Sequence, residues 1–345
     1  MDTSRGAESG RILLARIGAL GDTIMALPVA QALKSRNPSC RVDFLCSASV
    51  APLLELSSHI DRVYPLKHRN VPYRLSREKQ KLVKQLKNQR YSRAVLMENA
   101  QHFFTILRKT GIQKTSSYVE HRFDPSLHSV ENNLRLAGLG GDSEVELKID
   151  LDLASPSCHG FEADLEGLAR PWVGIHPGYG PPGRKSDQTT RLKGWPRGSF
   201  SRLAQALQER GASVIITGSR QDSRDSQLIA DHLDPRRTRV LAGRTTLPQL
   251  AGLITTLDLL VSVDSGPAHL GAALGTPLVV LWGPAKWVQT RPLPSTASLE
   301  LLRQDVPCSP CYDTPAMKSC RRNICMESIR VERVFAACCK SLDAG

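Results

Sequence analysis

Strand and helix signals alternate through both halves of this chain, and that alternation limits the possible fold more than any other feature. In the first half, short apolar runs predict strands at 11–16, 41–46 and 94–97. Helical patterns lie between or beside them, near 22–35, 50–56 and 76–88. This rhythm is typical of a parallel sheet that is covered by helices on both faces.

The pattern weakens between residues 143 and 171 and then starts again. Strands are predicted at 172–176, 213–217, 259–263 and 278–281, and helices at 200–210, 222–232 and 265–274. A length of 345 residues fits two domains at about 150 residues each. We therefore expect an α/β chain of two doubly wound domains, over 11–160 and 171–327, with a linker near 153–170. A disordered tail is expected over 1–10 and a C-terminal amphipathic helix over 328–345.

The charge of the chain indicates anionic partners. Lysine and arginine total 46 against 33 acidic residues, a net charge of +13. Phosphorylated substrates, acidic lipid headgroups and nucleic acid all fit such a charge. Neither a secretory signal nor an apolar run of membrane-spanning length is visible, so a cytoplasmic location is expected. Nine cysteines should then be thiols or metal ligands rather than disulfides.

The positive charge is densest between residues 62 and 93. This stretch holds eleven lysines and arginines and a single acid, Glu78. It could receive an acidic acceptor or an anionic membrane surface, or it could be an ordinary solvated helix face. Aromatic residues make up only 5% of the chain, which leaves few stacking platforms and argues against nucleic acid.

A glycine-rich turn follows the first predicted strand and ends in a carboxylate. Gly18 and Gly21 allow a tight turn, and Asp22 stands at the start of a helix, at the edge of the sheet where ligands bind. The spacing does not match a dinucleotide-binding loop. Asp22 is either a helix cap or a general base that takes a proton from a hydroxyl, and the residues alone favour neither.

A second turn at the same kind of edge follows the strand at 259–263. Asp264, Ser265 and Gly266 lead into a helix, where backbone N–H groups and the helix dipole favour an anion such as a diphosphate. Asp264 or Ser265 could equally be a plain helix cap. His269, one turn later, could be a ligand-binding residue or a core histidine.

The loop before Lys193 is rich in cations and hydroxyls. It carries Thr189, Thr190, Arg191 and Lys193, which would suit a diphosphate leaving group. A solvated basic loop is the alternative interpretation.

Four cysteines gather near the C-terminus. Cys308, Cys311, Cys320 and Cys325 lie within 18 residues, which favours a tetrahedral thiolate site for zinc or iron over four free thiols. Such a site would be structural, because four protein thiolates leave no open position for a substrate.

Taken together, these motifs resemble glycosyltransferase family 9, the ADP-heptose:lipopolysaccharide heptosyltransferases and their relatives. The opening ILLARIGALGDTIMALP at 12–28 carries much of the resemblance. The matching segments of the second half are GIHPG at 174–178, KGWP at 193–196, GS at 218–219, LAGRTTL at 241–247 and VDSGPAHL at 263–270. They stand in family order between about residues 11 and 335.

The resemblance implies a GT-B fold, in which two Rossmann-like domains face a central cleft, and metal-independent, inverting transfer of a heptose. The first domain would bind the acceptor, an anionic glycolipid of the lipopolysaccharide inner core, at the cytoplasmic face of the inner membrane. The second domain would bind ADP-heptose. Asp22 would be the base and Lys193 a contact to the donor phosphates. The remaining donor contacts implied are Thr189, Thr190, Asp222, Asp264, Ser265, Gly266 and His269; serine replaces the family's threonine at 265 and keeps its hydroxyl.

Three other functions stay open. The same motifs would serve a transferase that uses another sugar nucleotide or a protein acceptor. A nucleic-acid-binding module built on the cysteine cluster would bind duplex with a steep salt dependence. A glycosyltransferase-like binding protein without activity is disfavoured, because Asp22 and Lys193 are both present.

Overall fold

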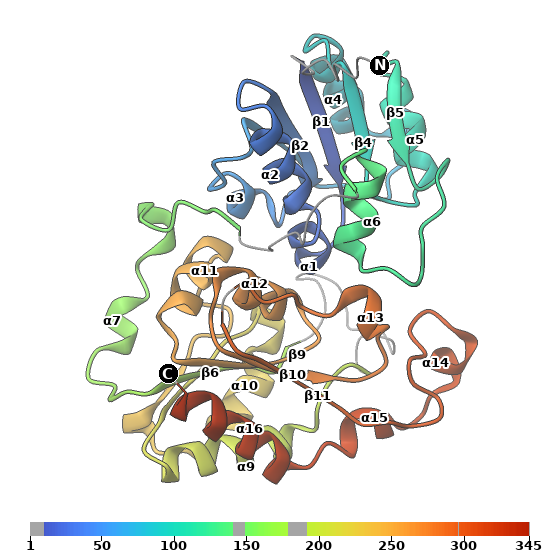
Figure 1. Cartoon of the computed structure of the whole chain (residues 1–345). Helices are drawn as coiled ribbons and strands as arrows, with labels where there is room; N and C mark the ends of the chain where they lie inside the picture. Colours follow the sequence, from blue (N-terminus) through green and yellow to red (C-terminus); the bar gives the residue numbers. More distant parts are fainter. Residues whose placement is uncertain (1–9, 141–148, 179–191, 296, 345) are drawn as a thin grey trace, which may run out of the picture. The chain divides into compact units, whose positions relative to one another are not determined.

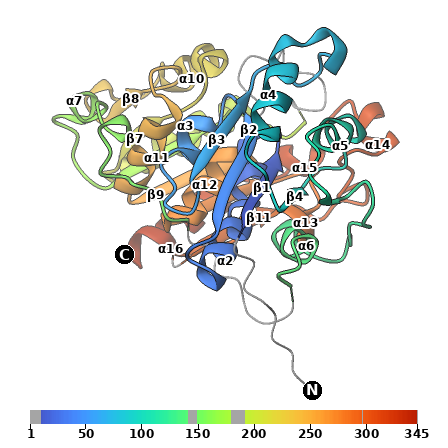
Figure 2. The same ribbon diagram turned by 90° about the horizontal axis from the view of Figure 1, so that it is seen from above.

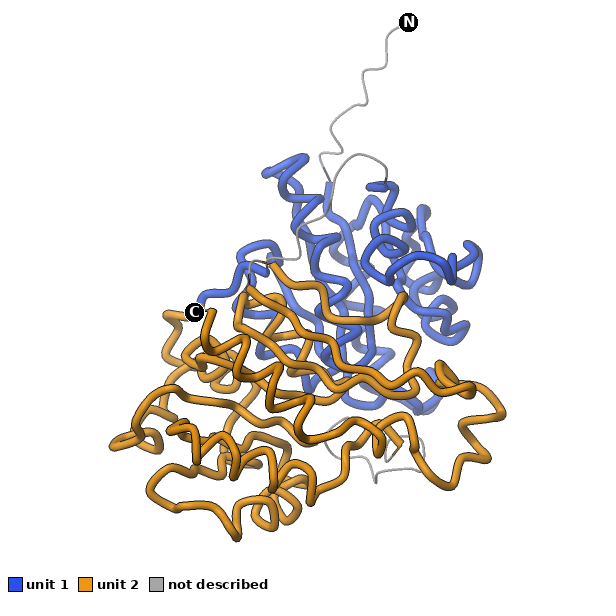
Figure 3. The backbone as a smooth tube through the Cα atoms, turned by 60° about the horizontal axis from the view of Figure 1, so that its bottom comes forward, with its two compact units in different colours: residues 1–152 blue, residues 153–345 orange. Residues whose placement is uncertain are grey.

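A computed structural model describes residues 10–140, 149–178, 192–295 and 297–344. The chain forms two compact units, residues 1–152 and 153–345, which are coloured separately in Figure 3. The tail predicted for the first ten residues falls on 1–9, outside the described part.

The first unit is built on a five-stranded parallel sheet. Its strands, in the order β3-β2-β1-β4-β5, are β1 (Arg11–Arg16), β2 (Arg41–Ser47), β3 (Arg62–Leu66), β4 (Arg93–Leu96) and β5 (Lys114–Ser117). The helices are α1 (Leu20–Ile24), α2 (Leu27–Arg36), α3 (Ala51–Leu54), α4 (Arg77–Lys87), α5 (Gln101–Arg108) and α6 (Ser129–Leu136), with a 3-10 turn, η1, at Tyr73–Leu75. Helices α2 and α6 pack together on one face, and α4 and α5 pack together on the other (Figures 1 and 2).

The second unit has a six-stranded parallel sheet of Rossmann order. Its strands run β11-β10-β9-β6-β7-β8 and are β6 (Trp172–His176), β7 (Ser213–Ile216), β8 (Thr238–Val240), β9 (Leu259–Val263), β10 (Leu278–Trp282) and β11 (Leu299–Arg303). One face carries α9 (Arg197–Glu209), α10 (Ser223–Ala230) and α16 (Val331–Asp343); the other carries α11 (Leu247–Thr256) and α12 (Gly266–Leu274). Short helices complete the unit: α7 (Glu162–Leu165), α13 (Trp287–Thr290), α14 (Pro315–Ser319) and α15 (Ile324–Glu327), with 3-10 turns at Pro156–Cys158, Arg220–Asp222 and Pro235–Arg237.

The central strands are buried on both faces, which explains why their sequences are mainly apolar. All five residues of β9 and of β10 are buried. Parallel strands between two helix layers have no solvated side, so alternation of polar and apolar residues is lost. The predicted α/β fold with two doubly wound units is therefore confirmed.

Two features of the first half and the linker differ from the sequence prediction. The helix predicted over 22–35 is two helices, α1 and α2. Pro28 has no N–H to continue the hydrogen bonds of α1, and it is instead the second residue of α2. The second unit also begins earlier than predicted, at Leu153. The carbonyl of Cys158 lies against Gly252 of α11, where a Cβ would come within 2.2 Å of it. This contact anchors the expected linker to the second unit.

Among the helices that the structure describes, none is long and apolar enough to cross a membrane.

Candidate active site

Each sheet has one point at which the strand order reverses, and ligands of doubly wound folds bind there, outside the carboxyl ends of the strands. In the first unit this switch point lies between β1 and β4, and in the second between β6 and β9. The residues that follow these four strands include most of the predicted site residues. Each unit is described separately below.

Asp22 lies at the switch point of the first unit, on the short helix that follows β1. Ala19, rather than Asp22, is the residue before the first helical turn. The carboxylate of Asp22 accepts a hydrogen bond from the Ala19 N–H at 3.3 Å and forms an ion pair with Arg16 at 2.8 Å. Its side chain keeps 35% of its surface exposed. Helix stabilisation and proton abstraction are therefore compatible roles for one carboxylate.

Arg16 links the two strands that flank this switch point. It is the last residue of β1, and its guanidinium donates to the carbonyl of Met97, just after β4, at 2.5 Å. Burial lowers the pKa of Arg16, but Asp22 and Glu98 outweigh that effect and raise it. The permanent positive charge of Arg16 thus holds Asp22 in place.

Glu98 is a site residue that the sequence analysis missed. It follows β4, is only 2% exposed, and pairs with Arg69 at 2.9 Å. Burial raises the pKa of Glu98, while Arg16 and Arg69 oppose the rise. Because a single acid after a strand has no distinctive spacing, only the parallel register of β1 and β4 could have brought it next to Arg16.

Lys193 and Asp264 meet across the switch point of the second unit. Lys193 follows β6, Asp264 follows β9, and the lysine ammonium lies 2.7 Å from the carboxylate. The ammonium also lies 4.5 Å from the ring centre of Tyr312. Two residues that the sequence proposed separately as donor contacts are therefore direct neighbours.

Helix α12 begins at Gly266, two residues after Asp264 of this pair. Ser265 precedes the helix, and its hydroxyl lies 2.9 Å from that of Ser262 rather than capping a helical N–H. The N–H groups of a first helical turn have no partner within the helix, and Pro267 contributes none. The amides of Ser265 and Gly266 are thus the ones suited to an anion.

The other predicted donor contacts divide into three cases. His269 is buried within α12, a position that fits the core alternative and leaves its role as a donor contact a prediction. Asp222 uses one carboxylate oxygen to accept from the Ser219 N–H at 2.7 Å and from the Ser219 hydroxyl at 2.6 Å. This turn-capping role leaves Asp222 a second oxygen for a ligand. Thr189, Thr190 and Arg191 lie outside the described residues.

His176, the last residue of β6, is a buried polar residue at the same switch point. Its Nδ1 lies 2.9 Å from the Thr217 hydroxyl. Burial lowers the pKa of His176 to about 4, against a smaller opposing effect of Asp222. The folded protein therefore holds a neutral imidazole that the unfolded chain protonates near pH 6.5.

This difference predicts a loss of stability in acid. As the pH falls from about 6.5 to about 4, wild type should lose up to roughly 3 kcal/mol of unfolding free energy at this residue. His176→Gln removes the titration, so urea unfolding measured at each pH should show wild type losing more than the variant. The exposed His232 provides the control His232→Gln, which should follow wild type. Parallel pH profiles for wild type and His176→Gln would contradict the assignment.

The four cysteines of the C-terminal cluster interact but do not form a ready metal site. Burial raises the pKa of Cys325 to about 11, and the thiols of Cys311, Cys308 and Cys320 add to the rise. Yet among the residues described here, no three histidine, cysteine or acidic side chains are placed to hold a metal ion. The predicted zinc or iron is not confirmed.

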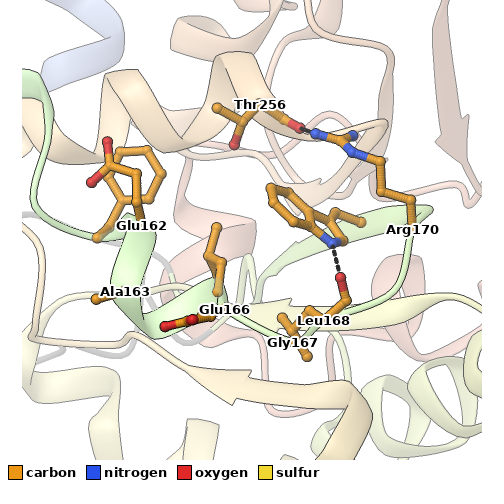
Figure 4. Close-up of a pocket in the computed structure, with 10 residues that line it drawn as sticks. Glu162, Ala163, Glu166, Gly167, Leu168, Arg170 and Thr256 are labelled. Atoms are coloured by element: carbon orange, nitrogen blue, oxygen red, sulfur yellow. Dashed lines mark hydrogen bonds between the residues drawn. The ribbon is translucent and has the colours of Figure 1, made fainter.

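A surface hollow at the other edge of the second sheet is separate from these residues. It is lined by α7 and the start of β6 (Figure 4). Arg170 stacks on Trp172, with 4.2 Å from the guanidinium carbon to the ring centre, and donates to the Thr256 carbonyl at 3.1 Å. Because Trp172 is the first residue of β6, the hollow lies at the amino ends of the strands, away from the switch point.

Comparison with known proteins extends the resemblance found in the sequence. The sequence profile of glycosyltransferase family 9 (heptosyltransferase) matches residues 79–320. Lipopolysaccharide heptosyltransferase 3 of Escherichia coli is 28% identical over 296 residues, covering 79% of this chain and 83% of the relative. Lipopolysaccharide heptosyltransferase 2 of Escherichia coli K12 is 27% identical over 313 residues, covering 82% and 85%.

Solved structures match nearly the whole chain. ADP-heptose lipopolysaccharide heptosyltransferase II of Escherichia coli superposes with a TM-score of 0.77 at 23% identity, covering 97% of this chain and 99% of that one. A family 9 glycosyltransferase of Veillonella parvula gives 0.79 at 17% identity and 98% coverage of both chains. The iron-containing heptosyltransferase TibC, solved with ADP-D-β-D-heptose, gives 0.61 at 16% identity, covering 97% and 76%. These matches confirm the GT-B fold class.

Proposed function

The chain belongs to glycosyltransferase family 9, and from that premise we propose that it transfers a heptose from ADP-heptose to a hydroxyl of the lipopolysaccharide inner core. The acceptor is lipid A–Kdo or a core heptose. The observation that carries the proposal is the Lys193–Asp264 pair beside the N-terminus of α12. The names of the two Escherichia coli relatives support the choice of heptose and acceptor.

On the donor side, the second unit holds ADP-heptose by its diphosphate. Lys193 and the amides of Ser265 and Gly266 bring positive potential to the phosphate oxygens, and the dipole of α12 adds to it. Their effect grows as the bond between the anomeric carbon and the phosphate oxygen breaks, because the leaving ADP gains negative charge. Asp264 orients the Lys193 ammonium at 2.7 Å. Thr189, Thr190 and the free oxygen of Asp222 are further donor contacts in this proposal.

On the acceptor side, the first unit supplies the base. The carboxylate of Asp22 takes the proton of the acceptor hydroxyl as that oxygen attacks the anomeric carbon from the face opposite ADP, which inverts the configuration. Arg16 keeps the carboxylate fixed through its 2.8 Å contact. The lysine and amide groups supply the charge stabilisation of the leaving group, so the proposed transfer needs no catalytic metal.

Such an acceptor places the enzyme in the cytoplasm, with peripheral contact to the inner face of the membrane. Lipid A and the inner-core sugars are anionic, and the net charge of +13 favours contact with them. The basic stretch of α4 lies on the first unit, which is the acceptor unit in this proposal.

A screen of donors and acceptors tests this function against its nearest alternative. Wild-type protein is incubated with ADP-heptose, ADP-glucose or a uridine diphosphate sugar, each with and without lipid A–Kdo or a heptosylated core, and nucleotide release is measured. We expect release only with ADP-heptose and a core acceptor. Release with another donor, or only with a protein acceptor, would keep the fold and the family but replace the substrate.

The cysteine cluster yields a separate prediction about a structural metal. Its four thiols are the donor set that zinc or iron takes in tetrahedral sites, and those of Cys308 and Cys320 lie close enough to help raise the pKa values of Cys311 and Cys325. We predict about one zinc or iron per chain by elemental analysis of protein purified without chelators. Cys308→Ser together with Cys311→Ser should remove it, while Cys40→Ser, far from the cluster in sequence, should keep it. A wild-type protein free of metal would contradict the prediction.

A further inference from the structure

The side chain of Leu75 is 78% exposed, the largest value among the big apolar side chains in the described part of the chain. Leu75 ends the 3-10 turn η1, one residue before the cap of α4. A single exposed leucine is common on protein surfaces and carries no meaning alone. Its surroundings decide whether it is a binding feature.

The backbone around Leu75 is held firmly, so the leucine is presented outward by a bonded turn. The buried ammonium of Lys79 donates to the carbonyls of Arg69 at 2.7 Å and Val71 at 2.6 Å. The side-chain amide of Gln80 donates to the carbonyl of Arg74 at 3.0 Å. Burying a charged ammonium is costly unless it is hydrogen-bonded. The two hydrogen bonds of Lys79 meet this need, and they fix the loop that precedes α4.

The outer face of α4 is a stripe of cations that begins beside Leu75. Arg77, Lys81 and Lys84 are exposed and stand at helical spacings of four and three residues. Lys87 extends the stripe. The buried face of the same helix consists of Lys79, Leu82, Val83 and Leu86.

The single acid of this stretch is turned away from the stripe. The carboxylate of Glu78 accepts from the backbone N–H groups of Lys67 at 2.7 Å and His68 at 3.1 Å. Helix α5 packs beside α4 on the same face of the sheet (Figure 2). Lys109, the residue after α5, adds more positive charge, because its ammonium lies 5.3 Å from the Tyr73 ring centre in η1. The surface therefore presents one apolar side chain, Leu75, surrounded by cationic side chains.

We propose that this surface docks the protein on an anionic lipid bilayer. We call it the Leu75 surface and define it as Leu75, Arg74, Arg77, Lys81, Lys84 and Lys87. An apolar side chain that enters the boundary between headgroups and acyl chains, surrounded by cations over anionic headgroups, is how peripheral proteins bind such membranes. A soluble oligosaccharide would match the cations but would leave Leu75 in water. The inference rests on the proposed membrane contact and names the residues that make it.

Vesicle flotation with the full chain tests the docking without any substrate. Wild type should bind phosphatidylcholine vesicles that contain phosphatidylglycerol, and bind pure phosphatidylcholine far more weakly. Lys81→Glu, Lys84→Glu and Lys87→Glu together should lower the partition coefficient on the order of 100-fold, at about 1 kcal/mol for each lysine removed. Leu75→Ser should lower it about fivefold to tenfold, whereas Leu75→Trp should keep it.

Matched controls separate this surface from net charge and from exposure in general. Arg202→Glu, Arg224→Glu and Lys318→Glu change the charge equally at exposed residues of the second unit. Leu228→Ser removes another exposed leucine of that unit. Both control variants should bind vesicles within about twofold of wild type. Equal losses in the two charge-reversal variants would overturn the proposal, since they would show a nonspecific charge effect.

Other outcomes identify other partners. If the Leu75→Ser variant bound vesicles as tightly as wild type, the Leu75 side chain would not enter the bilayer, and the proposal would also be overturned. Duplex DNA that binds more tightly than the vesicles would point to nucleic acid instead. The flotation assay contains no donor or acceptor substrate, so it measures vesicle binding separately from catalysis. Vesicle docking without heptose transfer would support this inference and reject the proposed function. Heptose transfer without vesicle docking would support the proposed function and overturn this inference.

Discussion

Asp22→Asn should lower the turnover number for acceptor-dependent ADP release by about a thousandfold, which is the middle of the range for loss of a general base. The amide keeps the size of the carboxylate and can still face Arg16, but it cannot take a proton from the acceptor hydroxyl. Steady-state ADP release with a saturating acceptor measures the effect. The affinity for ADP, measured by calorimetry, should stay within about twofold, because Asp22 lies on the first unit and the proposed donor site lies on the second.

A matched variant separates chemistry from folding. Asp61 is another carboxylate of the first unit that forms an ion pair, with Lys34 at 2.7 Å, but it lies before β3, away from the switch point. Asp61→Asn should leave turnover almost unchanged. A turnover of Asp22→Asn close to that of wild type would remove Asp22 from the chemistry and leave its contact with the Ala19 N–H as its role.

Lys193→Met should lower kcat/KM for ADP-heptose by about a hundredfold or more, because a preorganised charge at the leaving diphosphate is lost. Part of any loss could come from Asp264, whose carboxylate is mostly buried and would be left without the ammonium. Thermal unfolding of the second unit should therefore occur at a lower temperature in this variant. Lys193→Arg, which keeps the charge, should retain much more activity.

A double variant separates the two effects. Lys193→Met with Asp264→Asn removes the ion pair as a whole and should recover the melting temperature without recovering kcat/KM. Lys318→Ala, at an exposed lysine of the same unit, should change neither quantity. Recovery of activity in the double variant would mean that Lys193 acts only through folding, and would contradict its contact with the donor phosphates.

The fold was predictable where strands are central and failed at the edges of the sheets. The predicted bounds of β1, β6 and β9 agree with the structure to the residue, because these strands are mostly buried and mainly apolar. By contrast, β5 is Lys-Thr-Ser-Ser, and all three residues of β8 are only half-buried. Edge strands have one neighbour and partial exposure, so their sequences carry a weak pattern.

The site was predictable where a residue stands in a motif and failed where only the fold brings residues together. Asp22 and Asp264 each follow a strand in a recognisable turn, and Lys193 stands in the segment KGWP before α9 and pairs with Asp264. Arg16, Glu98 and Tyr312 gain their places through neighbouring strands and loops distant in sequence. No local spacing predicts such contacts, because they depend on sheet register and on packing rather than on periodicity.

Mass spectrometry of the reaction product tests the central claim most directly. Wild-type protein is incubated with ADP-heptose and either lipid A–Kdo or a core that ends in heptose, and the acceptor is analysed. The account predicts that one of the two acceptors gains the mass of a single heptose, in a yield equal to the ADP released. An unmodified acceptor together with free heptose, or no consumption of ADP-heptose with either acceptor, would contradict it.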